Sequence, residues 1–338
     1  MNTTVTTGRE INTIRPILSV GVYIALTTFL SYTILIVAII GIVSNSFVII
    51  TCSKIGFSET INISYLALGI SDLMASTIRT WGALCFIFVV ADTKLPFDPA
   101  SVSVTSAFYL GQGFEKTTAF ITAFIAVERC ICVQFPLHVK TMVTKKRTIV
   151  SNTIIYLLGF GPANLSFIAF PFRWVFSTAQ NQTILTAIPT NTPLHYIIAR
   201  GLMAYHGTLL HFTALIVVWI CTIFLAVGLD KKAVIRKENF NHSIAKDDKQ
   251  KERHVIKTVF LLAVTYLGCS TPTAATTLVP HFEPEFTTAR ALGRISLVCH
   301  LTSAFLTQLN SSANLFIFIY MGSKFRRVFW ALFGKRLT

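Results

Sequence analysis

The stretch Ser101–Val127, SVSVTSAFYLGQGFEKTTAFITAFIAV, is followed directly by Glu128-Arg129-Cys130 and then by the run ICVQFPLHVKTMVTKKR, which ends at Arg147. About 20 predominantly apolar residues cross a bilayer as a helix, and this stretch is long enough. Lys and Arg gather on the cytosolic side of membrane helices. The stretch therefore predicts a membrane helix whose charged end lies at the inner face.

The composition excludes an ordinary soluble domain. Of the 338 residues, 53% are apolar and only 13% are charged, whereas soluble domains carry about a quarter charged residues. Five runs of at least 25 residues contain no Asp, Glu, Lys or Arg: Pro16–Ser53, Thr148–Phe172, Gly201–Leu229, Thr258–Phe282 and Ile295–Ser323. Two further segments, Ile61–Val90 and Ser101–Val133, are apolar despite internal charges. Each of the seven is long enough to span a membrane.

We therefore predict an all-α membrane protein, a seven-transmembrane-helix bundle. The expected helices cover residues 23–52, 61–90, 101–133, 148–172, 195–229, 249–280 and 288–320, after an extracellular tail at 1–22. Residues 322–338 should form a short amphipathic helix and a cytoplasmic tail, because apolar residues recur at helical spacing within Phe325–Phe333. Such a helix lies in the membrane surface rather than across it.

The net charge of +15 would suggest nucleic-acid binding in a soluble protein. Here 20 of the 29 basic residues fall in the loops and tail that lie on one side of the seven spans. Because basic residues favour the cytosolic side, we predict a multi-pass plasma-membrane protein with its amino terminus outside. The sequons at Asn2 and Asn181 then fall outside, where they would be glycosylated. No nucleic-acid partner is expected.

Four motifs in order carry a family resemblance: Leu66–Leu73 (LALGISDL), Glu128-Arg129-Cys130, Tyr266–Pro272 (YLGCSTP) and Asn310–Phe318 (NSSANLFIF). Their order and spacing resemble the rhodopsin-like (class A) G-protein-coupled receptors (GPCRs) over nearly the whole chain. The run ERCICVQFPLHVK looks most like divergent chemosensory and neuropeptide-type receptors of molluscs.

The resemblance implies two sets of functional residues. One is a polar pocket around the carboxylate of helix 2, where a sodium ion would bind: Asn45, Asp72, Thr118, Asn310 and Ser311, with Asn314 beside them. The other is an activation switch at the cytosolic half of the bundle: Glu128, Arg129, Glu252, Pro272, Asn314 and Phe318. In this switch, acids hold Arg129 at rest and release it to meet a heterotrimeric G protein.

Several positions depart from the family pattern. Leu315 and Phe318 replace the proline and tyrosine of helix 7, and Ser270 replaces the tryptophan of helix 6. The disulfide that ties the outer end of helix 3 to the second outer loop is also missing, because Val104 stands at its position and residues 173–194 contain no cysteine. We therefore expect a more mobile outer loop.

Charges inside the spans are costly and are functional by default. Arg79 lies two helical turns beyond Asp72 on the same helix face and needs an anion, for which Glu115 is the obvious candidate. Two interpretations of Arg79 and Glu115 are left open: a buried structural ion pair and a ligand-binding site. His206 and His300 are further ligand-binding candidates, and the partner of Lys116 cannot be predicted.

These features together predict a receptor that binds an extracellular chemical or peptide ligand and activates a G protein by movement of helix 6. Gly111 and Gln308 stand where amine receptors and opsins carry their aspartate and lysine, so neither ligand class is favoured. No catalysis and no metal or cofactor other than the sodium ion is expected. The rival function is a transporter or channel that uses the intramembrane charges.

Overall fold

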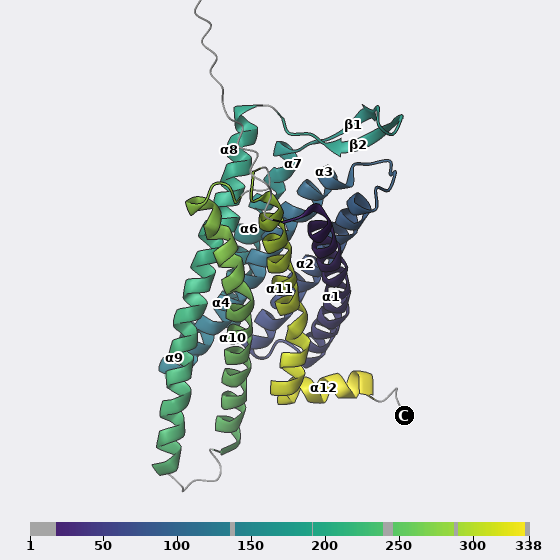
Figure 1. The fold of residues 1–338 in the computed structure, drawn as a ribbon. Helices are drawn as coiled ribbons and strands as arrows, with labels where there is room; N and C mark the ends of the chain where they lie inside the picture. Colours follow the sequence, from purple (N-terminus) through teal and green to yellow (C-terminus); the bar gives the residue numbers. More distant parts are fainter. Residues whose placement is uncertain (1–17, 136–138, 191, 239–245, 287–289, 335–338) are drawn as a thin grey trace, which may run out of the picture.

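The computed structural model describes residues 18–135, 139–190, 192–238, 246–286 and 290–334, and within helices it leaves out the side chains of 140, 228–238 and 246–254. Within these ranges the chain forms a bundle of seven long helical segments, with a two-stranded hairpin at one end and a short helix, α12, lying across the other (Figure 1). We refer to these as the hairpin end and the α12 end.

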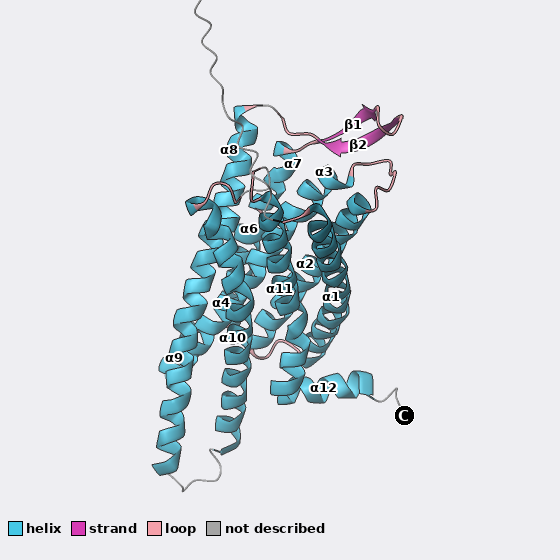
Figure 2. Ribbon diagram, viewed as in Figure 1, coloured by secondary structure: helices cyan, strands magenta, loops and turns pink. Residues whose placement is uncertain are grey.

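The seven segments follow the chain in order, and Figure 2 shows that helix dominates throughout. The first, second, sixth and seventh are single helices: α1 (Val20–Ile55), α2 (Thr60–Val90), α10 (Lys246–Phe282) and α11 (Gly293–Met321). The third joins α3 (Pro99–Ser103), η1 (Val104–Tyr109) and α4 (Leu110–Gln134). The fourth joins α6 (Lys145–Phe160), η2 (Pro162–Leu165) and α7 (Ser166–Ala169), and the fifth joins α8 (Pro193–Leu202), η3 (Met203–Leu210) and α9 (His211–Glu238). The remaining elements are α5 (Val139–Met142), β1 (Phe172–Ser177), β2 (Gln182–Ala187) and α12 (Ser323–Phe333).

Six of these segments are long and apolar enough to cross a membrane, the fifth and sixth over Pro193–Val227 and Val255–Phe282. Helix α11 is the seventh segment and is less apolar than the others. It contains several polar residues whose side chains are buried: Gln308, Ser311, Ser312 and Asn314. Buried polar groups are tolerated inside a membrane bundle when they find hydrogen-bond partners. The predicted fold class, a seven-helix membrane bundle, is confirmed.

Local chemistry explains where several helices begin and end. Ser19 and Thr144 cap α1 and α6 by accepting hydrogen bonds from backbone N–H groups of the first turn. Gly56 ends α1 with a φ of 81°, a conformation that glycine adopts without strain. The fourth helix changes to a tighter 3-10 turn at Pro162, since proline lacks the backbone donor.

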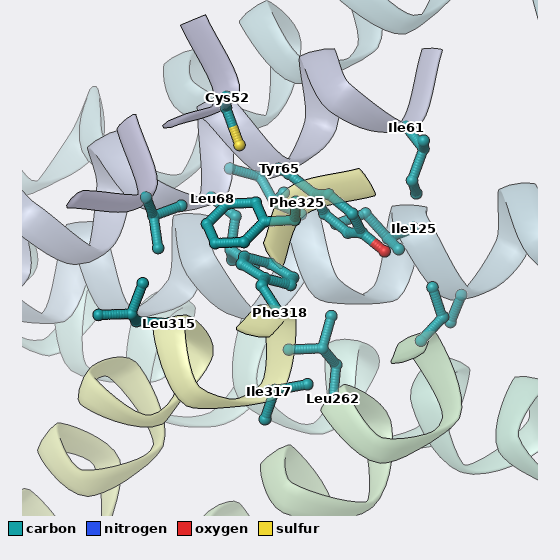
Figure 3. Close-up of a cluster of buried hydrophobic side chains, with 14 of the residues drawn as sticks. Cys52, Ile61, Tyr65, Leu68, Ile125, Leu262, Leu315, Ile317, Phe318 and Phe325 are labelled. Atoms are coloured by element: carbon teal, nitrogen blue, oxygen red, sulfur yellow. The ribbon is translucent and has the colours of Figure 1, made fainter. Parts of the chain in front are cut away.

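The core at the α12 end is aromatic and links helices from both halves of the chain. Phe318 of α11 is fully buried, with its ring centroid 4.4 Å from Tyr65 of α2 and 5.4 Å from Phe325 of α12 (Figure 3). Phe325 and Phe329 face inward from α12, while Arg326 and Arg327 are exposed. This division gives α12 the amphipathic character predicted from its sequence.

The loop at residues 173–194, which was expected to be mobile, contains a hairpin, and its mobility stays a prediction. Strands β1 and β2 pair antiparallel, with Phe172 opposite Ala187. The hairpin is bonded to the start of the third segment: Asp98 N donates to Leu185 O at 2.8 Å, and Ser101 Oγ lies 2.8 Å from Thr186 Oγ1. Hydrogen bonds therefore tie the hairpin to the third segment, and the cysteines of the described residues form no disulfide with one another.

Candidate functional site

The most polar part of the bundle interior surrounds Asp72 of α2, which is fully buried. Its Oδ1 atom accepts a hydrogen bond from Thr118 Oγ1 of α4 at 2.9 Å. Its Oδ2 atom accepts one from Asn314 Nδ2 of α11 at 2.5 Å. Hydrogen bonds of this kind compensate for burial of a carboxylate. Three helices therefore meet at Asp72, two of them through residues that the sequence placed around it.

Asn45 of α1 is also buried, but it does not contact Asp72 directly. Its Nδ2 atom donates to the carbonyl oxygens of Gly41 and Ser311, at 2.9 and 3.1 Å. Asn45 therefore ties α1 to the backbone of α11 beside the Asp72 cluster. The remaining predicted members of the pocket, Asn310 and Ser311, line the cavity next to Asp72.

This polar cavity has a volume of about 30 Å³ and reaches from Asp72 across to α9 and α10. A volume of roughly 10–15 Å³ already accommodates one water molecule. Its lining includes Asp72, Glu115, Lys116 and His211. The cavity is therefore large enough for water or a small ion but not for an organic ligand.

The residues present do not fit the sodium ion that the family resemblance implied. Both oxygens of Asp72 already accept hydrogen bonds. Two carboxylates, Asp72 and Glu115, stand beside two cations, Lys116 and the Arg79 that pairs with Glu115. These four charges sum to zero, so a sodium ion would add an unbalanced charge to a region of low dielectric constant.

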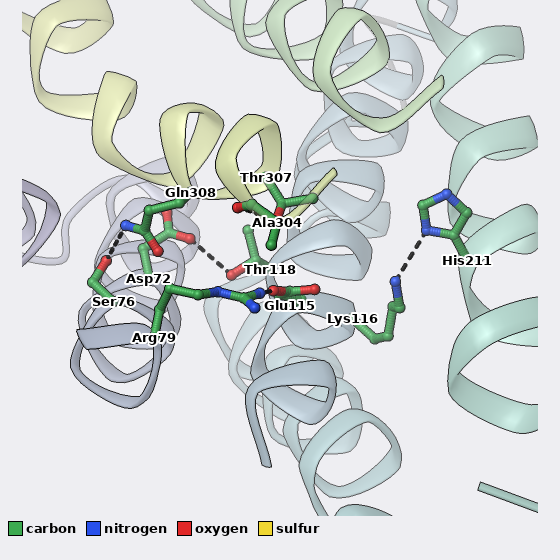
Figure 4. Close-up of polar contacts among 10 residues, drawn as sticks. All are labelled: Asp72, Ser76, Arg79, Glu115, Lys116, Thr118, His211, Ala304, Thr307 and Gln308. Carbon is green, nitrogen blue, oxygen red and sulfur yellow. Dashed lines mark hydrogen bonds and ion pairs between the residues drawn. The ribbon is translucent and has the colours of Figure 1, made fainter. Parts of the chain in front are cut away.

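The expected ion pair between Arg79 of α2 and Glu115 of α4 is present (Figure 4). The guanidinium of Arg79 points directly at the Glu115 carboxylate, and the two side chains keep 22% and 14% of their surfaces accessible. Both side chains are therefore partly buried, and the Oε1 atom of Glu115 is itself buried. The pair lies on the side of Asp72 that faces the hairpin end, two helical turns along α2.

Lys116 has a partner that the sequence did not indicate. Its Nζ atom lies 3.0 Å from His211 Nδ1 at the start of α9, and both residues are buried (Figure 4). Among the described residues no carboxylate lies within 4 Å of this ammonium group. The sequence indicated only the direction of the Lys116 side chain. Because adjacent residues on a helix point about 100° apart, Lys116 was expected to face a different neighbour from Glu115.

A second cavity, the helix-1/2/3/7 pocket, lies between α1, α2, the third segment and α11, and has a volume of about 140 Å³. Its walls are mostly apolar: Ile34, Ile78, Ala83, Phe86, Phe108 and Leu301. Arg79 is the one charged residue among the described residues that line it, beside the hydroxyls of Ser31 and Ser103.

The two predicted histidines do not join these cavities. His206, within η3, is buried, and its Nε2 atom lies 2.8 Å from the carbonyl oxygen of Gly159 in α6. This hydrogen bond links the fifth segment to the fourth. His300 of α11 is exposed and lines neither the polar cavity nor the helix-1/2/3/7 pocket. A ligand-binding role for either stays a prediction.

The predicted switch lies at the α12 end, where the structure describes part of it. Glu128 accepts hydrogen bonds from Thr148 Oγ1 at 2.8 Å and Ser64 Oγ at 3.4 Å. The Nε atom of Arg129 is buried and has no hydrogen-bond partner among the described residues. Glu252 lies on α10, but its side chain is outside the described part, so its contact with Arg129 stays a prediction.

The other predicted residues fall on α10, α11 and the hairpin. Pro272 lies inside α10, which continues through it to Phe282. Asn314 and Phe318 join the Asp72 cluster and the aromatic core, respectively. Asn181 lies in the exposed turn between β1 and β2, with a φ of 52°, whereas Asn2 lies outside the described residues.

Comparison with known proteins gives one family. A family model described as "Serpentine type 7TM GPCR chemoreceptor Srw" matches residues 31–336, which include most of α1 and every later helix of the bundle. No curated protein matches the chain. The closer resemblance to rhodopsin-like and molluscan receptors is not confirmed by this match.

Proposed function

Because the chain belongs to the Srw family of serpentine seven-transmembrane GPCR chemoreceptors, we propose that it binds an external chemical or peptide ligand and activates a heterotrimeric G protein. The family match over residues 31–336 carries this proposal. The family is one of membrane receptors and not of enzymes, so no reaction is catalysed.

The orientation is part of the proposal. Exposed basic residues cluster at the α12 end, among them Lys54, Lys145, Lys146, Arg326 and Arg327. Basic residues favour the cytosolic side and attract the anionic lipids of its leaflet. We therefore assign the α12 end to the cytoplasm, and the hairpin end, with Asn181 at its tip, to the exterior.

Activation would proceed by a population shift between two arrangements of the bundle. Ligand bound in the exterior half would favour the arrangement in which the cytosolic end of α10 moves outward and opens a cleft for the G protein. Arg129 is poised for such a role, because its Nε atom is buried and lacks a partner among the described residues. In the resting state, Glu252 of α10 would hold its guanidinium.

The experiment is to express the receptor in cells with a promiscuous G protein and to record calcium release against a panel of odorants, water-soluble chemicals and peptides. Glu252→Gln should raise ligand-independent signalling, because it removes the charge that restrains Arg129. Glu283→Gln is the matched control, since Glu283 is an exposed acid just beyond the other end of α10. Equal basal signals from both variants at equal surface expression would contradict the switch.

A transporter or channel remains the second candidate because Asp72, Arg79, Glu115 and Lys116 form a line of intramembrane charges. The described contacts favour the receptor, since these charges are engaged in the Arg79–Glu115 pair and in hydrogen bonds to neighbouring helices. Ion flux through reconstituted vesicles, without any G-protein activation in cells, would reverse this preference.

A further inference from the structure

The helix-1/2/3/7 pocket combines one cation with an apolar wall. Apart from Arg79, its described lining is uncharged, and only Ser31 and Ser103 add side-chain hydroxyls. Gly111 of α4 adds no side chain to the pocket wall. A Cβ atom at this position would contact Ile78 at 3.6 Å. An apolar pocket with a single charged group favours an amphiphile whose charge is opposite to that group.

Arg79 can exchange one carboxylate partner for another. Its guanidinium carries five N–H donors in a planar fork that matches the two oxygens of a carboxylate. The Glu115 contact is made through one terminal nitrogen, and 22% of the side chain remains accessible, more than the 14% of Glu115. A carboxylate entering the helix-1/2/3/7 pocket would therefore meet donors that already face an anion.

The ion pair also lies between the two cavities. Arg79 lines the helix-1/2/3/7 pocket, whereas Glu115 lines the polar cavity that contains Asp72. An anion bound on the Arg79 side would compete with Glu115 for the same guanidinium. The released Glu115 would take up the proton that the acid loses as it binds, so the charges around the polar cavity would still sum to zero.

We propose that the helix-1/2/3/7 pocket binds a small aliphatic carboxylate, whose hydrocarbon chain lies along the apolar wall and whose carboxylate replaces Glu115 on Arg79. The inference rests on the proposed receptor function and adds the chemical class of its ligand. The volume of about 140 Å³ is well below the roughly 300–1,000 Å³ of pockets for drug-sized ligands. It therefore admits a chain of only a few carbon atoms.

Binding is tested on the purified full-length receptor in lipid nanodiscs, without a G protein. The probes are pentanoate, its neutral analogue pentanamide, and pentylammonium, which have similar size and differ in charge. Pentanoate should bind at least about tenfold more tightly than pentanamide, since hydrogen bonds to charged groups are worth a factor of this order. Pentylammonium should not bind measurably, because its charge has the sign of Arg79.

Two variants separate the ligand contact from stability. Glu115→Gln removes the internal competitor and should tighten pentanoate binding, while pentanamide binding stays unchanged. The double variant Arg79→Gln with Glu115→Gln leaves no unpaired buried charge, so it should fold, and it should bind pentanoate no better than pentanamide. Glu283→Gln serves as the matched control and should leave every affinity unchanged.

Three results would overturn the inference: equal binding of pentanoate and pentanamide to the wild type, unchanged pentanoate affinity in Glu115→Gln, or tighter binding of palmitate than of pentanoate. The last would indicate a membrane fatty acid rather than a short soluble acid. If these occur while Glu252→Gln still raises basal signalling, the ligand inference fails and the receptor function stands. Pentanoate binding without signalling from any variant would instead count against the receptor function.

Discussion

Replacing Gly41 with alanine tests whether the polar contact between α1, α2 and α11 holds the bundle together. A Cβ atom at Gly41 would lie 2.6 Å from Ser76 Oγ and 2.7 Å from both Gln308 Nε2 and Ser312 Oγ. These three atoms bond to one another, because Gln308 Nε2 donates to Ser76 Oγ at 2.9 Å and to Ser312 Oγ at 3.2 Å. The new methyl group would therefore force the cluster apart.

The expected loss of stability can be worked from these contacts. Two hydrogen bonds of the Gln308 amide would be lengthened or lost, at about 1 kcal/mol each. Overpacking a well-filled site adds about 1–3 kcal/mol. The sum is about 3–5 kcal/mol, which corresponds to an apparent melting midpoint lower by at least about 6 °C if each kcal/mol shifts it by about 2 °C.

The assay is the fraction of detergent-solubilised receptor that stays monodisperse after heating, measured as a midpoint temperature at a fixed heating time because unfolding of such proteins is commonly irreversible. Gly268→Ala is the matched control, since Gly268 is exposed within α10 and a Cβ atom there has nothing within 4 Å. Its midpoint should stay level or rise slightly, because alanine favours helix over glycine. Equal midpoints for the two variants would refute the role assigned to Gly41.

Three further variants probe other contacts. Tyr156→Phe removes the hydrogen bond to Ala67 O at 2.7 Å and should lower the same midpoint by about 2 °C, whereas an unchanged midpoint would mean that this tie between α6 and α2 is dispensable. Ser101→Ala should speed amide hydrogen exchange in β2 but not in α2, because Ser101 Oγ contacts Thr186 Oγ1 and Ala187 N; equal exchange would contradict the tie. Lys116→Met should make the midpoint rise when sodium replaces choline, since the buried charges no longer balance, and a sodium effect in the wild type would contradict the charge count.

The bundle could be predicted from the sequence because each helix must cross the same thickness of hydrocarbon. Long uncharged runs therefore mark the spans even where polar residues such as Gln308 and Asn314 lower the hydropathy of α11. The hairpin was missed, although Phe172–Ser177 and Gln182–Ala187 are short, rich in aromatic and β-branched residues and separated by a turn. Ser101, which is bonded to β2, lies far away in the sequence, and no local pattern predicts such a contact.

The candidate site was likewise predictable from the sequence only in part. The neighbours of Asp72 were predictable because motifs on three helices fix their depth in the membrane. The partner of Lys116 was not, because it lies on the fifth segment, whose register no motif in the sequence fixes. The π-helical turn Met203–Leu210 immediately precedes His211 and shifts the direction of the residues that follow. Sequence periodicity alone could not anticipate that turn.

The placement of charge along α2 explains how a ligand near the hairpin end would influence the α12 end. Tyr65, Asp72 and Arg79 are each seven residues apart, so they lie on one face at intervals of about 10 Å. They contact, in order, Phe318 of α11, Asn314 of α11 and Glu115 of α4. A shift of α2 that accommodates a new anion on Arg79 would therefore act on α11 at two points. One of these points is Phe318, beside which α12 begins and the proposed G-protein surface lies.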